Sequence, residues 1–177
     1  MDKFFKNIKI YLVFIVIFQL VVLTWEYLGA IYPVWSGTEI YLKTVPVDPR
    51  DMFRGNYARL SYDISTIPVN DFANMTAKIR NEEIVYVKLV KKGDFYEYDG
   101  SSFQKPETGI FLRGRINQKY ISSYDKNVSV KYGIEAFFAK KEKAQKLESE
   151  LSSSAAMAIV KVASNGKAAL IDVRKYK

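Results

Sequence analysis

The feature that most constrains this chain is an uncharged, strongly apolar run near its N-terminus, from Ile10 to Trp25. The apolar character resumes after Glu26 and continues to Tyr32, which supplies the roughly 20 residues that a helix needs to cross the hydrocarbon of a bilayer. The run is apolar all round, whereas a surface helix of a soluble domain keeps a polar face. The sequence therefore predicts a transmembrane helix at residues 10–32.

The flanks of this segment predict its orientation. Lysine side chains precede it within residues 1–9, and Lys-rich flanks stay on the cytoplasmic side of a membrane. Glu26 is expected either at the headgroup level or against a partner helix, because an unpaired carboxylate in hydrocarbon is costly. Its neighbours form an aromatic belt of the kind found at membrane interfaces, made of Trp25, Tyr27, Tyr32 and Trp35.

A cleaved signal peptide is the competing interpretation, because it also combines a basic start with an apolar run. Ala30 is a small residue of the type that precedes a cleavage site, but Leu28 is unsuited to the position two before it, and the run is long. We therefore expect an uncleaved signal-anchor, with residues 1–9 in the cytoplasm and the C-terminal part of the chain on the far side.

The absence of two residue types narrows the chemistry. The chain has no Cys and no His, which excludes disulfides, thiolate metal sites, the commonest zinc ligands and the Ser-His or Cys-His nucleophile pairs. We predict a protein that is not an enzyme and that has no cofactor and no metal. The formal net charge of +8 is compatible with several partners, but nucleic acid is disfavoured because the anchor places the domain in the wrong compartment.

After a linker at residues 33–37, residues 38–177 are predicted to form one extracytoplasmic domain. Alternating apolar and polar residues predict strands at 38–47, 57–64, 84–90, 95–98, 110–116, 128–138, 156–162 and 167–173. Asn165-Gly166 is a two-residue hairpin signal, and residues 140–151 favour a short helix or an exposed loop. The predicted fold is mainly β: a transmembrane helix, then a small antiparallel β barrel or sandwich with one short helix.

Two segments of this domain carry a resemblance. The first runs from Pro46 through Asp48, Arg50 and Asp51 to Arg54-Gly55-Asn56-Tyr57, Leu60 and Tyr62, and the second is Tyr132–Phe138. With the closing hairpin at 165–168, they resemble the signature of the bacterial GDYXXLXY family. The resemblance implies a protein anchored in the bacterial cytoplasmic membrane, often encoded beside a multi-spanning membrane protein, and it implies no particular reaction. Asn56 stands where the family pattern has Asp, so the chain lacks a carboxylate there.

The first segment is interpreted as a charged turn between two strands, in which Gly55 permits a tight bend. Its charges either fix the turn by pairing with one another, with tyrosine hydroxyls capping it, or present arginine donors to an anionic group. In the second segment, Glu135 is expected beside Phe137, with an arginine partner across the sheet. The charged residues of the first segment are Asp48, Arg50, Asp51 and Arg54.

Three functions remain open. The first is a non-enzymatic accessory or interaction module that partners an integral membrane protein in the bilayer. The second is a membrane-anchored peptidase of Ser-Lys type, with Ser36 after the anchor and Lys88 on a strand. The third is binding of an anionic envelope lipid or glycan through Arg50 and Arg54, aided by basic and aromatic residues at 91–98.

Overall fold

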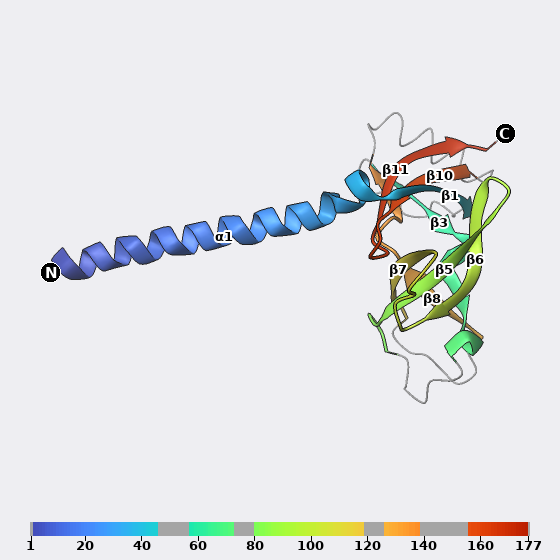
Figure 1. Cartoon of the computed structure of the whole chain (residues 1–177), viewed down its shortest axis with the longest axis horizontal. Coiled ribbons are helices and arrows are strands. Elements are labelled where there is room, and N and C mark those ends of the chain that lie inside the picture. Colours follow the sequence, from blue (N-terminus) through green and yellow to red (C-terminus); the bar gives the residue numbers. More distant parts are fainter. Residues whose placement is uncertain (1, 46–56, 73–79, 119–125, 139–155, 177) are drawn as a thin grey trace.

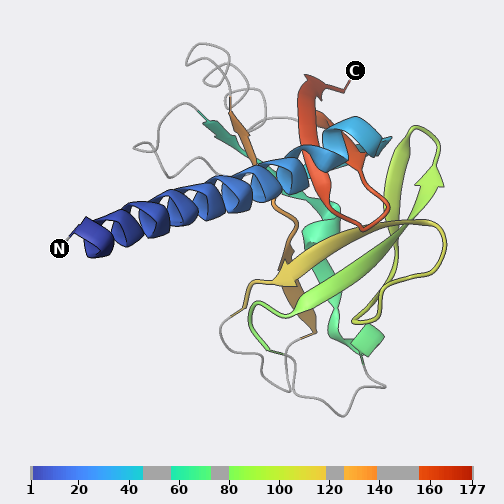
Figure 2. The same ribbon diagram turned by 60° about the vertical axis from the view of Figure 1, so that its left-hand side comes forward.

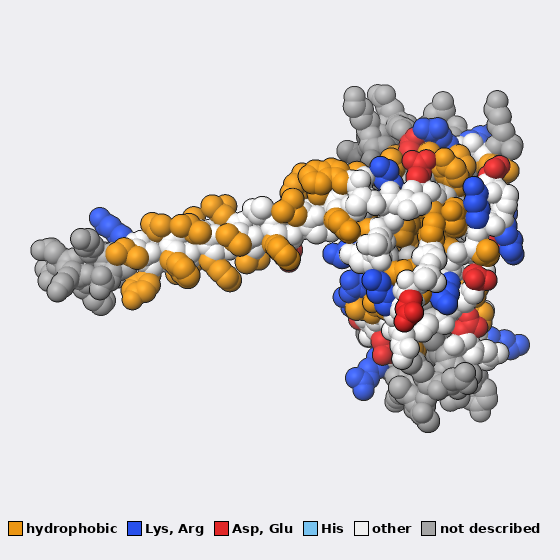
Figure 3. All heavy atoms as spheres, in the orientation of Figure 1, with side chains coloured by type: hydrophobic (Ala, Val, Ile, Leu, Met, Phe, Trp, Pro, Cys, Tyr) orange, Lys and Arg blue, Asp and Glu red, His pale blue; other side chains and the backbone are white. Residues whose placement is uncertain are grey.

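A single N-terminal helix projects from a β-rich domain (Figure 1). The computed structural model describes residues 2–45, 57–72, 80–118, 126–138 and 156–176. Helix α1 spans Asp2–Ser36, and its part from Lys9 to Ser36 is long and apolar enough to span a membrane. Its large apolar side chains are exposed from Ile10 to Leu28, and they cover the visible face of the helix in Figure 3.

The predicted linker at residues 33–37 is instead helical almost to its end. Helix α1 continues to Ser36, and Gly37 alone separates it from β1 (Thr38–Val45). Pro33 lacks an N–H and costs the helix one hydrogen bond. The turn beyond it closes because Gly37 N–H donates to the Pro33 carbonyl at 2.9 Å and the Ser36 hydroxyl donates to the Tyr32 carbonyl at 2.9 Å.

In its described residues, the domain is built from strands and two 3-10 turns. After β1 these are, in chain order, β2 (Tyr57–Arg59), β3 (Ser61–Tyr62), η1 (Asp63–Ser65), β4 (Thr66–Pro68), η2 (Val69–Phe72), β5 (Ile84–Lys92), β6 (Phe95–Ser102), β7 (Ile110–Ile116), β8 (Asn127–Lys131), β9 (Ala136–Phe138), β10 (Ala156–Val162) and β11 (Ala168–Lys175).

Antiparallel pairing organises these strands into a 4-stranded sheet of order β11-β10-β1-β3, a 5-stranded sheet of order β4-β8-β7-β5-β6 and the pair β2-β9. Strand β6 also contacts β1, so the two larger sheets curve around one core in a nearly barrel-shaped arrangement (Figure 2). The predicted fold class, a membrane-type helix followed by a small antiparallel β domain, is confirmed.

The core follows the period-two alternation of the strands. Val85 and Val87 of β5 are fully buried, as are Leu112 and Ile116 of β7, whereas Lys88 points to solvent. The predicted strands at 84–90, 110–116 and 156–162 coincide with β5, β7 and β10, apart from a two-residue extension of β5. Strands with one buried face were therefore predicted well.

Several predicted boundaries are wrong, each for a local reason. The strand expected at 57–64 divides into β2, β3 and a 3-10 turn, and the strand expected at 128–138 is interrupted before β9. The interruption occurs at Gly133, whose φ of 83° leaves the extended region. The strand expected at 95–98 continues as β6 to Ser102, through Asp99-Gly100, where the register with β5 shifts. The helix expected at 140–151 lies outside the described residues.

The closing hairpin is present but has a different loop. Ala163 N–H donates to the Lys167 carbonyl at 2.9 Å, and Gly166 N–H donates to the Ala163 carbonyl at 2.8 Å. Gly166 has φ 80°, which fits the three-residue hairpin loop with a left-handed glycine rather than the predicted two-residue loop. This loop passes over β7, where Arg113 N–H donates to the Gly166 carbonyl at 2.8 Å.

Candidate functional site

The two segments singled out in the sequence lie side by side in the fold. Strand β2 pairs with β9, placing the backbones of Tyr57 and Phe138 opposite each other. Just beyond the pair, Leu60 N–H donates to the Glu135 carbonyl at 2.8 Å. Residues far apart in the chain thus form one unit, in which Leu60 and Tyr62 are buried.

Glu135 organises the turn that interrupts β8 and β9. One carboxylate oxygen accepts the N–H of Tyr132 at 2.6 Å, and the other accepts the N–H of Gly133 at 3.0 Å. We expected an arginine partner across the sheet, but within the described part of the chain the carboxylate binds backbone amides. Charge-assisted bonds of this kind are stronger than neutral ones, so Glu135 holds the left-handed turn at Gly133 in place.

Two tyrosine hydroxyls complete the unit. Tyr62 donates to the Ile134 carbonyl at 2.7 Å, and Tyr132 donates to the Ile64 carbonyl at 2.5 Å. Burial raises the pKa of the Tyr62 hydroxyl far above its usual range, and the Glu135 charge raises it further. Burial likewise raises the pKa of Tyr132, with smaller contributions from Tyr98 and Glu135. Both hydroxyls stay protonated at neutral pH and act as structural donors.

The charged half of the first segment lies outside the described residues. It contains the charged residues Asp48, Arg50, Asp51 and Arg54, followed by the uncharged Gly55 and Asn56. The structure therefore places only the second half of this segment, Tyr57, Leu60 and Tyr62, of which the side chains of Leu60 and Tyr62 belong to the core. Their contacts with the second segment stabilise the fold.

The C-terminal end of α1 is held against the domain. Lys161 of β10 donates from Nζ to the Val34 carbonyl at 2.9 Å, where a cation also interacts favourably with the C-terminal end of the helix dipole. The hydroxyls of Tyr32 and Ser164 lie 3.5 Å apart in hydrogen-bond contact. Figure 2 shows the β10–β11 hairpin lying against the last turns of α1.

The expected aromatic belt is exposed at this end of the helix. Trp25, Tyr27, Tyr32 and Trp35 have exposed fractions of 78%, 63%, 41% and 71%, so they are available to an interface. Glu26, between the first two, is also exposed.

A groove of about 710 Å³ lies between this end of the helix and the domain. Its helix side is formed by Gly29, Ala30 and Pro33. Its domain side carries a set of basic side chains that we term the basic groove residues: Arg113, Arg115, Lys131 and Lys167. Glu82 and Glu135 also line it. This set is not predictable from the sequence, because single charges that alternate with apolar residues are typical of any solvated strand face. The only signal was Arg113-Gly-Arg115, which puts two guanidinium groups on one face.

A second hollow, of about 430 Å³, is lined by the tyrosine-rich segment at 95–98 together with Leu42, Asp63 and Tyr176. Tyr98 donates a hydrogen bond to Asp71 and lies 2.9 Å from the Ser101 hydroxyl oxygen. Burial and this carboxylate raise the pKa of Tyr98. The neighbouring Lys92 pairs with Glu97 at 2.8 Å on the exposed surface.

The proposed Ser-Lys pair is not assembled. The Ser36 hydroxyl donates to the Tyr32 carbonyl at the end of α1. Lys88 lies in the middle of β5 and is exposed, opposite Gly100 and Phe111. Across the ranges that the structure describes, no hydrogen bond joins the two side chains, and no group of three or more acidic side chains is arranged to hold a metal ion.

Comparison with known proteins gives one result. A family model described as GDYXXLXY protein matches residues 19–173, which includes both recognised segments, the closing hairpin and the second half of α1. No curated protein and no solved structure matches the chain.

Proposed function

Since the chain belongs to the GDYXXLXY family, we propose that it is a non-enzymatic accessory subunit, anchored in the bacterial cytoplasmic membrane beside a multi-spanning partner. The observation that carries the proposal is Glu26. Its carboxylate is exposed on an otherwise apolar helix, and it has no hydrogen bond or ion pair with any described residue. A charge at the edge of the hydrocarbon is stabilised by snorkelling or by a partner.

Gln19 is a second observation in favour of a partner helix. It precedes Glu26 by seven residues, and at about 100° per residue the two side chains share one face of the helix. Polar side chains at this depth form hydrogen bonds between helices. The opposite face is apolar apart from Thr24, whose hydroxyl donates a hydrogen bond to the Leu20 carbonyl at 2.7 Å. The helix therefore carries two polar side chains, Gln19 and Glu26, on the side proposed for a partner, and mainly apolar side chains on the side proposed for lipid.

A photo-crosslinking amino acid at position 19 tests this assignment, with position 21 on the opposite face as the matched control. In native membranes, position 19 should capture a multi-spanning protein that mild-detergent purification also recovers, and position 21 should capture mainly lipid. Capture of lipid alone at both positions, together with purification as a free monomer, would contradict the proposal.

We also propose that the N-terminus is cytoplasmic and that the domain is extracytoplasmic, because Lys3, Lys6 and Lys9 precede the span. The chain has no Cys, so a single cysteine at exposed position Lys88 gives a clean test. A membrane-impermeant maleimide should label it in intact spheroplasts. Labelling only after lysis would show the opposite orientation, with the domain in the cytoplasm.

A further inference from the structure

Three elements bring four cationic side chains to one edge of the domain. Arg113 and Arg115 are two residues apart in β7, so they share a face of the sheet. Lys131 of β8 is the direct cross-strand partner of Arg115. Lys167 enters from the β10–β11 loop and reaches α1, with its Nζ 3.8 Å from where a Cβ on Gly29 would lie. Figure 3 shows Lys and Arg side chains gathered on the domain beside the helix.

This arrangement is unfavourable for stability on its own. Like charges directly opposite each other on neighbouring strands are destabilising, and none of the four cations forms an ion pair with a described carboxylate. Arg115 uses one guanidinium nitrogen to donate to the Glu82 carbonyl at 2.9 Å. Glu135, although it lines the groove, has its carboxylate bound to two backbone amides. The groove lining thus carries four cations against two carboxylates, Glu82 and Glu135, which leaves a formal net charge of +2.

The position of the groove along the axis of α1 indicates which layer of a bilayer it faces. Gly29 and Pro33 line it, three and seven residues beyond Glu26, which corresponds to about 4.5–10.5 Å at about 1.5 Å per residue. The polar headgroup layer on each side of a bilayer is about 5–7 Å thick. With Trp25 and Tyr27 at the interface, the groove opens at the depth of the lipid headgroups.

We propose that the basic groove residues bind the phosphate of an anionic phospholipid in the leaflet on the domain's side. Guanidinium groups bind phosphate oxygens in a bidentate manner, and ammonium groups bind them as point charges. Juxtamembrane cations of this type attract anionic lipid. The site is separate from Arg50 and Arg54, and it requires no protein partner, so it stands or falls independently of the proposed subunit role.

Native mass spectrometry of the full chain, released from detergent after incubation with phosphatidylglycerol or phosphatidylcholine, tests the site. The informative variant is Lys131→Gln with Lys167→Gln, since neither ammonium group forms a hydrogen bond or ion pair with a described residue. The matched control is Lys88→Gln with Lys91→Gln, which removes the same charge from exposed positions of β5. Thermal unfolding of each variant checks that it is folded.

The wild type and the control should retain phosphatidylglycerol preferentially, and the Lys131/Lys167 variant should bind it about thirtyfold more weakly. Equal retention of the two lipids, or equal weakening in both double variants, would overturn the site. Inorganic phosphate serves as a third probe. If it alone raised the unfolding temperature as much as phosphatidylglycerol did, the groove would be a site for a free anion, and the lipid assignment would be wrong.

Discussion

The hydroxyl of Tyr62 donates a hydrogen bond to the carbonyl oxygen of Ile134 across 2.7 Å, and both residues are buried. Tyr62 belongs to the first recognised segment and Ile134 to the second. Together with the bond from Leu60 N–H to the Glu135 carbonyl, this contact joins the two segments directly. The first segment supplies the two hydrogen-bond donors, and the second segment supplies the two carbonyl acceptors.

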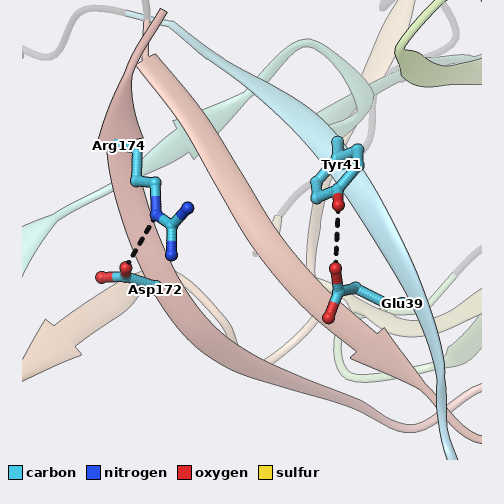
Figure 4. A network of polar contacts seen from close by, with 4 residues as sticks. All are labelled: Glu39, Tyr41, Asp172 and Arg174. Atoms are coloured by element: carbon cyan, nitrogen blue, oxygen red, sulfur yellow. Dashed lines mark hydrogen bonds and ion pairs between the residues drawn. The ribbon is translucent and has the colours of Figure 1, made fainter.

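Tyr62→Phe should destabilise the domain by about 1–3 kcal/mol, because the buried Ile134 carbonyl loses its side-chain donor. Tyr41→Phe is the control. It removes a solvent-exposed hydrogen bond of 2.9 Å to Glu39, which lies on the outer surface near the Asp172–Arg174 pair (Figure 4), and it should leave stability nearly unchanged. Urea unfolding of the full chain in detergent measures both; equal losses would refute the structural role of Tyr62.

Stability should decrease at alkaline pH through Tyr62 and Tyr132. The pKa of both hydroxyls is raised above the ordinary value of 10.0 in the folded chain. Below about pH 10 both are protonated in the folded and unfolded states, so their contribution is complete. Above it, the unfolded chain releases protons that the folded chain retains, and each tyrosine lowers stability by up to about 1.4 kcal/mol per pH unit.

This alkaline effect is measured by unfolding between pH 8 and pH 11, with the wild type compared to Tyr62→Phe. The variant should be less stable at pH 8, and its stability should fall less steeply above pH 10. Parallel curves for the two proteins would show that Tyr62 does not carry the pH dependence.

Glu135→Ala should destabilise the domain by about 1.5–3 kcal/mol, because charge-assisted bonds to two backbone amides are lost. Amide hydrogen exchange at Tyr132 and Gly133 should accelerate in the same variant. Glu97→Ala is the control: it removes a carboxylate whose partner Lys92 is exposed, and because such surface pairs contribute little, it should be much less destabilising. Unchanged exchange at the two amides would contradict the capping role.

Gly37→Ala should disturb the junction of helix and domain. A Cβ at this position would overlap the Pro33 carbonyl oxygen and lie 3.0 Å from the Val162 nitrogen, and overpacking of this type costs about 1–3 kcal/mol. Gly29→Ala is the control, since its nearest neighbour is the Lys167 Nζ at 3.8 Å.

The effect at Gly37 is measured by electron spin resonance distances between nitroxides at Leu23 and Lys88, introduced into the chain without competing cysteines. Gly37→Ala should broaden the distance distribution, whereas Gly29→Ala should leave it narrow. A narrow, unchanged distribution in Gly37→Ala would mean that the junction tolerates the added methyl group.

The sequence was informative wherever one physical signal dominated. The long apolar helix followed from an almost continuous apolar run, and β5, β7 and β10 followed from alternation over a buried face. The break between β8 and β9 was missed because it depends on Glu135 binding the turn amides, a contact that alternation cannot reveal. The groove was missed because Arg115, Lys131 and Lys167 are brought together only by strand pairing and by the loop at Gly166. A local sequence pattern predicts single helices and strands. A site assembled from several strands can be predicted only when the register in which those strands pair is known.

The single-residue junction at Gly37 has a mechanical consequence. Helix α1 has 35 residues, about 52 Å at about 1.5 Å per residue, and it joins β1 with almost no slack. If α1 spans a bilayer as proposed, a change in its tilt, whether from a thinner bilayer or from a moving neighbour, would turn the domain with it. The short junction would thus couple the orientation of the domain to the tilt of the helix, whereas a long flexible linker would let the two turn independently.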